Sequence, residues 1–175
     1  MEGIPIEPVG RVSGRAASVV EALTERSLTI AVAESLTGGL LVAELVSVPG
    51  ASVVVRGGVV AYATALKHSV LGVSESLLAE FGPVHPEVAG QMATGVRTAL
   101  AVDGIAADIG ISTTGVAGPG SQDGHPAGTA YVGIAIGDHV SVLGLTLTGD
   151  REAIRRAVVS ESIGALIIEL GLENR

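Results

Sequence analysis

The chain has 175 residues, of which 47% are hydrophobic and 16% charged, a composition typical of one soluble globular domain with a sizeable core. Ten basic residues against 18 acidic ones give a formal charge of −8, which argues against a nucleic-acid partner because phosphate binding needs clustered Lys and Arg. The absence of cysteine excludes disulfides, thiolate metal sites and a cysteine nucleophile. No apolar run reaches the roughly 18 residues of a membrane span, and the N-terminus lacks a secretory pattern, so we expect a cytoplasmic protein that does not bind membranes.

The first third of the chain predicts alternating helices and strands. After an expected flexible arm over residues 1–10, apolar residues at helical spacing predict a helix over 12–26. A buried strand over 27–33 leads into a turn at 34–39, and a helix over 40–48 follows. The order is therefore a strand, a loop rich in hydroxyls and glycines, and a helix N-terminus.

The middle of the chain predicts one strand and three helices. The β-branched residues of 53–63 indicate a strand with a bulge or kink at Gly57-Gly58. A short helix begins at Thr64, a second short helix with a serine N-cap covers 74–81, and a longer helix that opens with proline covers 86–102.

The C-terminal third predicts a hairpin and a last helix. Its elements are, in order, a strand over 107–112, a Gly/Pro loop over 113–128, strands over 129–136 and 140–147, and a helix over 150–170. Helices alternate with strands early and a hairpin comes late. This order predicts a single layered α/β domain over residues 11–172, with a mostly parallel, mixed central sheet flanked by helices.

Two loops of similar chemistry follow predicted strands, at 34–39 and 113–120. Loops at the carboxyl ends of neighbouring strands converge on one crevice of an open α/β sheet, so we expect Ser35 to lie near Thr114. Glycines let backbone amides approach a ligand, and a helix N-terminus favours anionic groups. The residues expected to contact a substrate here are Thr37, Gly38, Gly39, Thr114, Gly115 and Gly118.

Ser35 needs a base to become a nucleophile, and Lys67 is the best candidate. Lys67 is the only lysine of the chain, and a desolvated lysine can lose its proton where an arginine cannot. Tyr62, five residues earlier, has a hydroxyl that could relay or position a proton. The histidines are scattered without ligand-like spacing, so neither a metal site nor a Ser-His-Asp triad is expected; they are His68, His85, His125 and His139.

Two arginines on the first turns of the last predicted helix are candidates for binding a phosphate. Arg151 and Arg155 are four residues apart and share one helix face, and Asp150 is a suitable N-cap. A few arginines and backbone amides are enough to hold a single phosphate. A small phosphorylated substrate is therefore compatible with the acidic composition.

Several motifs resemble, in order along the chain, those of the CinA C-terminal domain family, whose characterised members are nicotinamide-nucleotide amidohydrolases. The matching segments are Ala33-Glu-Ser-Leu-Thr-Gly-Gly39, Val48-Pro-Gly-Ala51, Gly58-Val-Val-Ala-Tyr62 with Lys67, Leu71-Gly-Val73, Thr114-Gly-Val-Ala-Gly-Pro119, Gly128-Thr129 and Gly149-Asp-Arg151. Longer members carry an N-terminal nucleotide-pyrophosphatase domain that these 175 residues do not contain, so we expect a stand-alone domain without that activity.

The resemblance implies a Ser-Lys amidase that hydrolyses nicotinamide mononucleotide to nicotinate mononucleotide and ammonia, without metal or cofactor. It implies that Ser35 is the nucleophile, Lys67 its base and Tyr62 a positioning or relay group between them. Thr114 and the surrounding glycine backbone would contact the substrate, and Arg151 or Arg155 its phosphate. The chain departs from the family at Leu36, often a cysteine, and at His85, commonly a serine.

Three other readings compete with this one. A short-chain dehydrogenase also uses Ser, Tyr and Lys, but here they precede the glycine loop, and Tyr62 and Lys67 are five residues apart rather than four. A nucleotide-binding or competence-related protein without turnover, and a Ser-Lys amidase for another small amide, both remain open. The many Ala and Val residues and the few charges also lead us to expect a homo-oligomer.

Overall fold

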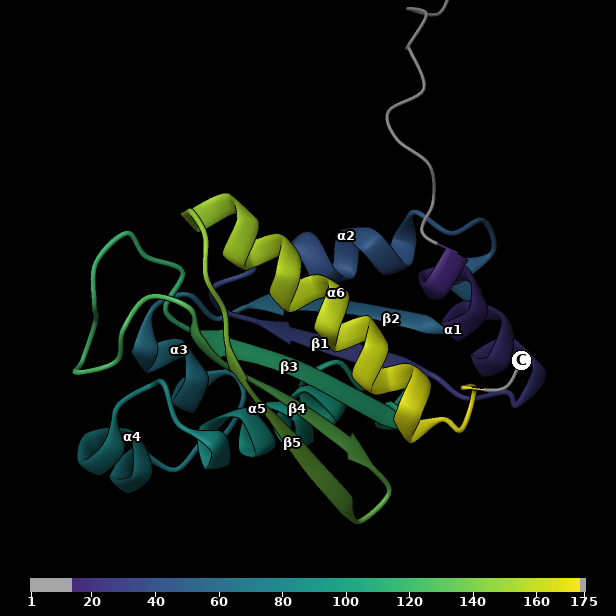
Figure 1. Cartoon of the computed structure of the whole chain (residues 1–175). Helices are drawn as coiled ribbons and strands as arrows, with labels where there is room; N and C mark the ends of the chain where they lie inside the picture. Colours follow the sequence, from purple (N-terminus) through teal and green to yellow (C-terminus); the bar gives the residue numbers. More distant parts are fainter. Residues whose placement is uncertain (1–13, 174–175) are drawn as a thin grey trace, which may run out of the picture.

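A computed structural model describes residues 14–173 (Figure 1). The helices are α1 (Gly14–Glu25), α2 (Leu40–Val46), α3 (Thr64–Ser69), α4 (Glu75–Phe81), α5 (Pro86–Ala99) and α6 (Arg151–Glu169), with a single 3₁₀ turn at Ala51–Val53. The strands are β1 (Ile30–Glu34), β2 (Val55–Val60), β3 (Ile109–Gly115), β4 (Thr129–Ile136) and β5 (His139–Thr146). The predicted arm over residues 1–10 and the predicted start of the first helix at residue 12 lie outside the described residues.

The five strands form one mixed sheet in the order β2-β1-β3-β4-β5. β1 pairs in parallel with both β2 and β3, whereas β3 with β4 and β4 with β5 pair antiparallel. β4 therefore runs against the other four strands, and the prediction of a mostly parallel, mixed sheet in one α/β domain is confirmed. The carboxyl ends of β1, β2 and β3 meet at one edge of the sheet, as the sequence predicted.

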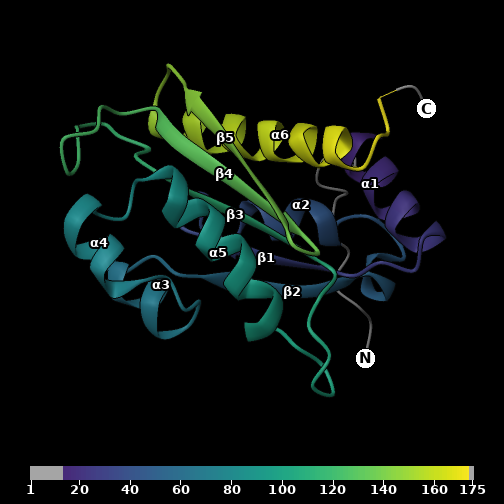
Figure 2. The same cartoon turned by 90° about the horizontal axis from the view of Figure 1, so that it is seen from below.

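Helices cover both faces of the sheet and bury two apolar cores. α1, α2 and α6 lie together on one face, and α5 packs across β1, β3, β4 and β5 on the other, next to α3 and α4 (Figures 1 and 2). The larger core lies under α1, α2 and α6, and the smaller one lies under α5. The near absence of aromatic residues is compensated by close approach of helix to strand, since a Cβ at Gly110 or Gly133 would collide with the α5 backbone.

The boundaries differ from prediction in both directions. The strands predicted over 27–33, 53–63 and 107–112 begin later, at Ile30, Val55 and Ile109, the second also ends earlier, at Val60, and the helix predicted over 86–102 ends at Ala99. Two strands are instead extended by loop residues. β1 ends one residue later than predicted, at Glu34, and β3 continues to Gly115 because Thr113 to Gly115 pair with β4. The predicted kink in the second strand is confirmed as a register shift at Arg56, next to Gly57, whose φ is 143°. Asp150 caps α6 as predicted by accepting a hydrogen bond from the Ala153 N–H at 2.8 Å.

No helix within residues 14–173 combines the length and the apolar character needed to cross a membrane.

Candidate active site

Three strand ends bring the predicted site residues together. Ser35 directly follows β1, Lys67 lies on α3 just after β2, and Thr114 lies near the end of β3. The Ser35 N–H donates to the Thr113 carbonyl at 3.0 Å, which fixes the start of the Ser35 loop to the neighbouring strand. The expected proximity of the two loops is therefore present in the fold.

Lys67 reaches Ser35 directly. Its Nζ lies 2.9 Å from the Ser35 Oγ and 2.9 Å from the Ala61 carbonyl oxygen, to which it donates. The Lys67 side chain is 1% exposed and Ser35 is 8% exposed. This is the hydrogen-bonded geometry that proton transfer between a nucleophile and its base requires.

Burial lowers the pKa of Lys67 from 10.5 to about 8. The cause is desolvation, which penalises the ammonium, and within residues 14–173 no carboxylate forms an ion pair with this amine to restore the charged form. A fraction of the amine is therefore neutral near neutral pH. In that form its lone pair can accept the Ser35 proton while an N–H still donates to Ala61.

A small cavity of about 90 Å³ opens onto this pair. Its walls include Ser35, Lys67, Tyr62, Thr114, Gln122 and Arg151. A larger hollow of about 570 Å³ lies between the β4-β5 hairpin and α6, but the one hydroxyl among its described lining residues, that of Ser141, is not hydrogen-bonded to a carboxylate or an amine. The small cavity is the candidate active site because the chemistry lies there.

Tyr62 and Arg151 form the outer part of this cavity. The Arg151 guanidinium donates to the Tyr62 hydroxyl at 3.0 Å and to the Gly118 carbonyl at 2.7 Å. Tyr62 is 63% exposed, and since Lys67 contacts Ser35 directly, the expectation that Tyr62 lies between them is wrong. Its hydroxyl instead orients Arg151, which leaves Arg151 on the cavity wall as the cation available to an anionic ligand.

The amides of Gly38 and Gly39, which the sequence predicted as ligand contacts, form hydrogen bonds within the protein. The Gly39 N–H and two α2 amides donate to the Glu34 carboxylate, and the Gly38 N–H donates to the Ser35 carbonyl. Thr37 is fully buried, with its hydroxyl 2.7 Å from that of Thr113. The hydroxyl of Thr37 and the amides of Gly38 and Gly39 are thus occupied within the protein, and none of the three residues lines the cavity at Ser35. Their contact with a substrate stays a prediction.

Arg155 also forms its hydrogen bonds within the protein. Its guanidinium donates to the Leu36 carbonyl at 3.0 Å and to the Thr37 carbonyl at 2.8 Å, and it forms an ion pair with Glu152 at 3.1 Å. Arg155 therefore fastens the Ser35 loop to α6, and unlike Arg151 it is not among the residues that line the cavity. Arg151 remains the candidate of the two.

The three predicted residues of the second loop lie around the cavity in different ways. Thr114 and Gly115 are on its wall, although the Thr114 hydroxyl already donates to the Pro83 carbonyl at 2.6 Å. Gly115 is at φ 157°, and a Cβ there would lie 2.5 Å from the Thr129 carbonyl oxygen. Gly118 contributes through its carbonyl, which holds Arg151.

Sequence reasoning missed two groups. Gln122 lies on the cavity wall, and the Gly/Pro loop that carries it gave no signal beyond its length. The Leu36 N–H, one residue after the nucleophile, makes no hydrogen bond within residues 14–173, so it is a free donor beside Ser35. Position alone could have suggested it, because the amide after a nucleophilic serine commonly faces the reacting carbonyl.

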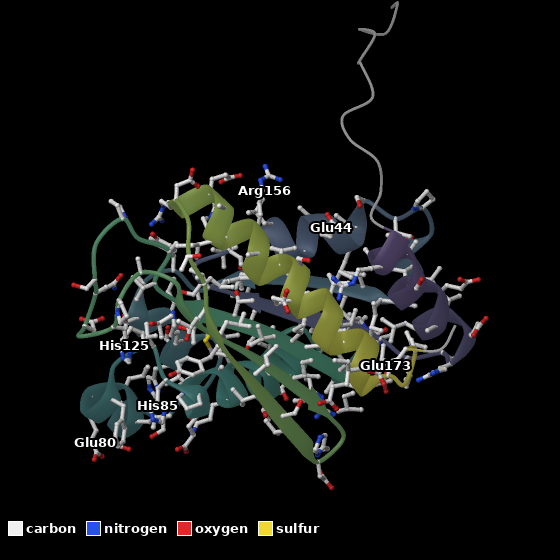
Figure 3. All side chains as sticks on the ribbon, viewed as in Figure 1. Glu44, Glu80, His85, His125, Arg156 and Glu173 are labelled. Carbon is white, nitrogen blue, oxygen red and sulfur yellow. The ribbon has the colours of Figure 1, made fainter. Side chains whose placement is uncertain are left out.

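Two of the histidines lie near this end of the sheet. His85 caps α5 through the Glu87 N–H and stacks on Phe81, with ring centroids 4.7 Å apart. His125 lies on the β3-β4 loop at the same end of the molecule (Figure 3). Among the described residues, no three His, Asp or Glu side chains are grouped as metal ligands.

Comparison with known proteins agrees with the fold and the motifs. The family model described as the CinA C-terminal domain matches residues 13–170. A CinA-like protein of Frankia casuarinae is 50% identical over 143 residues, covering 81% of this chain but 32% of that protein. The chain thus spans about a third of the length of that relative.

Solved structures show the same architecture. A CinA superfamily protein of Klebsiella pneumoniae superposes with a TM-score of 0.83 at 32% identity, covering 90% of this chain and 96% of that one. A CinA superfamily protein of Enterobacter cloacae gives a TM-score of 0.85 at 27% identity, with 97% and 98% covered. With the family model matched over nearly the whole chain, this protein belongs to the CinA C-terminal domain family.

Proposed function

We propose that the protein is a Ser-Lys amidase that hydrolyses the carboxamide of nicotinamide mononucleotide, giving nicotinate mononucleotide and ammonia. The observation that carries the proposal is the 2.9 Å contact between the Lys67 Nζ and the Ser35 Oγ inside a cavity. A buried lysine with a pKa near 8 costs stability, and such perturbed groups cluster at functional sites.

The first half of the reaction forms an acyl-enzyme. Neutral Lys67 takes the proton of Ser35 while the Oγ attacks the carboxamide carbon, and a tetrahedral oxyanion forms. The resulting ammonium then gives its proton to the amide nitrogen, the C–N bond breaks, and ammonia leaves. Lys67 is neutral again, and the nicotinoyl group is esterified to Ser35.

The second half returns the enzyme to its starting state. A water molecule enters, Lys67 takes one of its protons, and the hydroxide adds to the ester carbonyl. Collapse of this intermediate expels the Ser35 oxygen, which regains a proton from Lys67, and nicotinate mononucleotide is released. In both halves the oxyanion would accept a hydrogen bond from the Leu36 N–H, which directly follows Ser35 and has no partner within residues 14–173.

The size of the cavity fits a substrate whose reactive end is small. Binding sites for small molecules usually measure about 300–1,000 Å³, so a cavity of about 90 Å³ holds only the amide end of a nucleotide. The ribose and phosphate would then extend outward past Tyr62 to Arg151. The buried end accepts a neutral amide, and the outer end provides a cation for an anion.

The test is ammonia release from nicotinamide mononucleotide, compared with nicotinamide riboside, which lacks the phosphate. We expect kcat/KM to be about 30-fold higher for the nucleotide, since a charge-assisted hydrogen bond contributes about 1.5–3 kcal/mol. The Ser35→Ala protein supplies the background rate. Tight nucleotide binding without ammonia would instead favour the binding protein, and equal rates on both compounds would favour an amidase for another small amide.

Arg151→Ala should raise KM for the nucleotide about tenfold or more while leaving kcat within a few fold, because Arg151 binds the phosphate away from the reacting carbon. Tyr62→Phe removes the hydroxyl that orients Arg151 and should give a smaller effect in the same direction. Steady-state kinetics on both substrates measures this, and neither change should affect the riboside. A Tyr62→Phe protein with a strongly reduced kcat would restore the proton-relay role.

A further inference from the structure

Glu34 is a carboxylate buried without a positive partner. It is the last residue of β1 and is 0% exposed, and in the described part of the chain it forms no ion pair. Its two oxygens accept three backbone hydrogen bonds, from Gly39 at 2.9 Å, Leu41 at 3.1 Å and Val42 at 2.8 Å. These donors are amides at the N-terminus of α2 that have no partner within the helix.

The same residue connects the nucleophile to the base. Ser35 follows it in the chain, and the Glu34 carbonyl accepts the Ala61 N–H at 2.8 Å. The Ala61 carbonyl in turn accepts the hydrogen bond from the Lys67 Nζ at 2.9 Å. The side chain of Glu34 therefore anchors the loop of Ser35, while its backbone anchors the acceptor that orients Lys67.

We propose that Glu34 is a positioning residue that sets the distance between the Ser35 Oγ and the Lys67 Nζ, an inference that rests on the Ser-Lys chemistry proposed above. An ionised carboxylate has about four lone-pair sites, enough for three amide donors, whereas a glutamine offers one oxygen and turns an NH₂ toward those donors. Removing the charge weakens the link that the Glu34 side chain makes between the end of β1 and the first turn of α2, which closes the loop from Ser35 to Gly39. The nucleophile then moves relative to its base.

Glu34→Gln tests this inference, with Glu44→Gln as the matched control on the outer part of α2. In the wild type, the pH profile of kcat/KM, which reports the free enzyme, should rise to a plateau with a midpoint near the Lys67 pKa of about 8. Glu34→Gln should lower that plateau about 100-fold with the midpoint unchanged and KM within about threefold, since a shift of about 1 Å costs roughly that factor. Glu44→Gln should match the wild type.

Other outcomes would overturn it. A plateau equal to that of the wild type with a displaced midpoint would mean that Glu34 acts on the charge of Lys67. A lower melting temperature with unchanged kcat would mean a purely structural role. Glu34→Asp keeps the carboxylate that caps α2 but has a side chain shorter by one methylene. Its plateau should therefore lie between those of the wild type and Glu34→Gln.

Labelling with a fluorophosphonate probe tests the positioning role of Glu34 independently of the proposed nucleotide substrate. It phosphonylates an activated serine with loss of fluoride, whatever amide the enzyme hydrolyses, so its labelling rate at Ser35 reports the Ser-Lys pair alone. Wild-type labelling without ammonia release would refute the nucleotide substrate and leave the positioning role testable, with Glu34→Gln expected to label about 100-fold more slowly. Equal labelling of Glu34→Gln and wild type refutes the positioning role itself.

Discussion

Lys67→Arg should abolish ammonia release, lowering kcat by about 10³-fold or more, even though the positive charge is kept. Arginine stays protonated at any pH at which the protein is folded, so it cannot accept the Ser35 proton. In the wild type the Lys67 Nζ lies 2.9 Å from the Ser35 Oγ. In Lys67→Arg the group at this place would always be a proton donor and never a base. Initial rates from pH 6 to 10 measure the effect, and raising the pH should not restore activity.

The matched variant is Lys67→Met, which has similar length and no charge. It should be equally inactive, and both proteins should still bind nicotinate mononucleotide in calorimetry, which separates loss of the base from loss of the fold. Because nucleophile and base act as a unit, Ser35→Ala combined with Lys67→Met should be no slower than either single change. Substantial activity in Lys67→Arg would disprove the assignment of the base.

The parts predicted correctly from the sequence depend on local pattern and general topology. Hydrophobic periodicity defines the elements, and the convergence of parallel strand ends brings Ser35 close to Lys67. The unusual identity of Lys67 as the only lysine could be recognised without coordinates. These signals do not require knowledge of where a particular side chain points.

At the site, the predictions that the structure does not support concern polar groups whose hydrogen-bond partners are distant in sequence or are chosen among competing acceptors. The sequence predicted that the helix N-terminus after Gly39 would bind an anionic ligand, but the Glu34 carboxylate accepts the hydrogen bonds of its amides. Arg155 looked like a phosphate ligand, but it binds carbonyls 118 and 119 residues away. Arg151, one turn earlier on α6, remains on the cavity wall. Only the packed structure distinguishes the two arginines.

The burial of Lys67 should make the protein less stable than its inactive Lys67→Met variant at neutral pH. A pKa of about 8 in the folded chain, against 10.5 for the exposed side chain, corresponds to roughly 3 kcal/mol of destabilisation. The lost hydrogen bonds to Ser35 and Ala61 offset part of this, so we expect a net gain of about 1–2 kcal/mol for Lys67→Met at pH 7.

The sign of the pH dependence makes this test specific. Between pH 8 and 10.5 the unfolded chain still binds the Lys67 proton and the folded chain has released it, so the free energy of unfolding should rise with pH across that interval. Below pH 8 both states are protonated and the whole cost is present. Since the chain has no other lysine, the difference between wild type and Lys67→Met in urea unfolding isolates this titration from that of the tyrosines. A difference that stays constant from pH 7 to 10 would show that the folded amine has an ordinary pKa, and Lys67 would then lack the neutral fraction near pH 8 that activates Ser35.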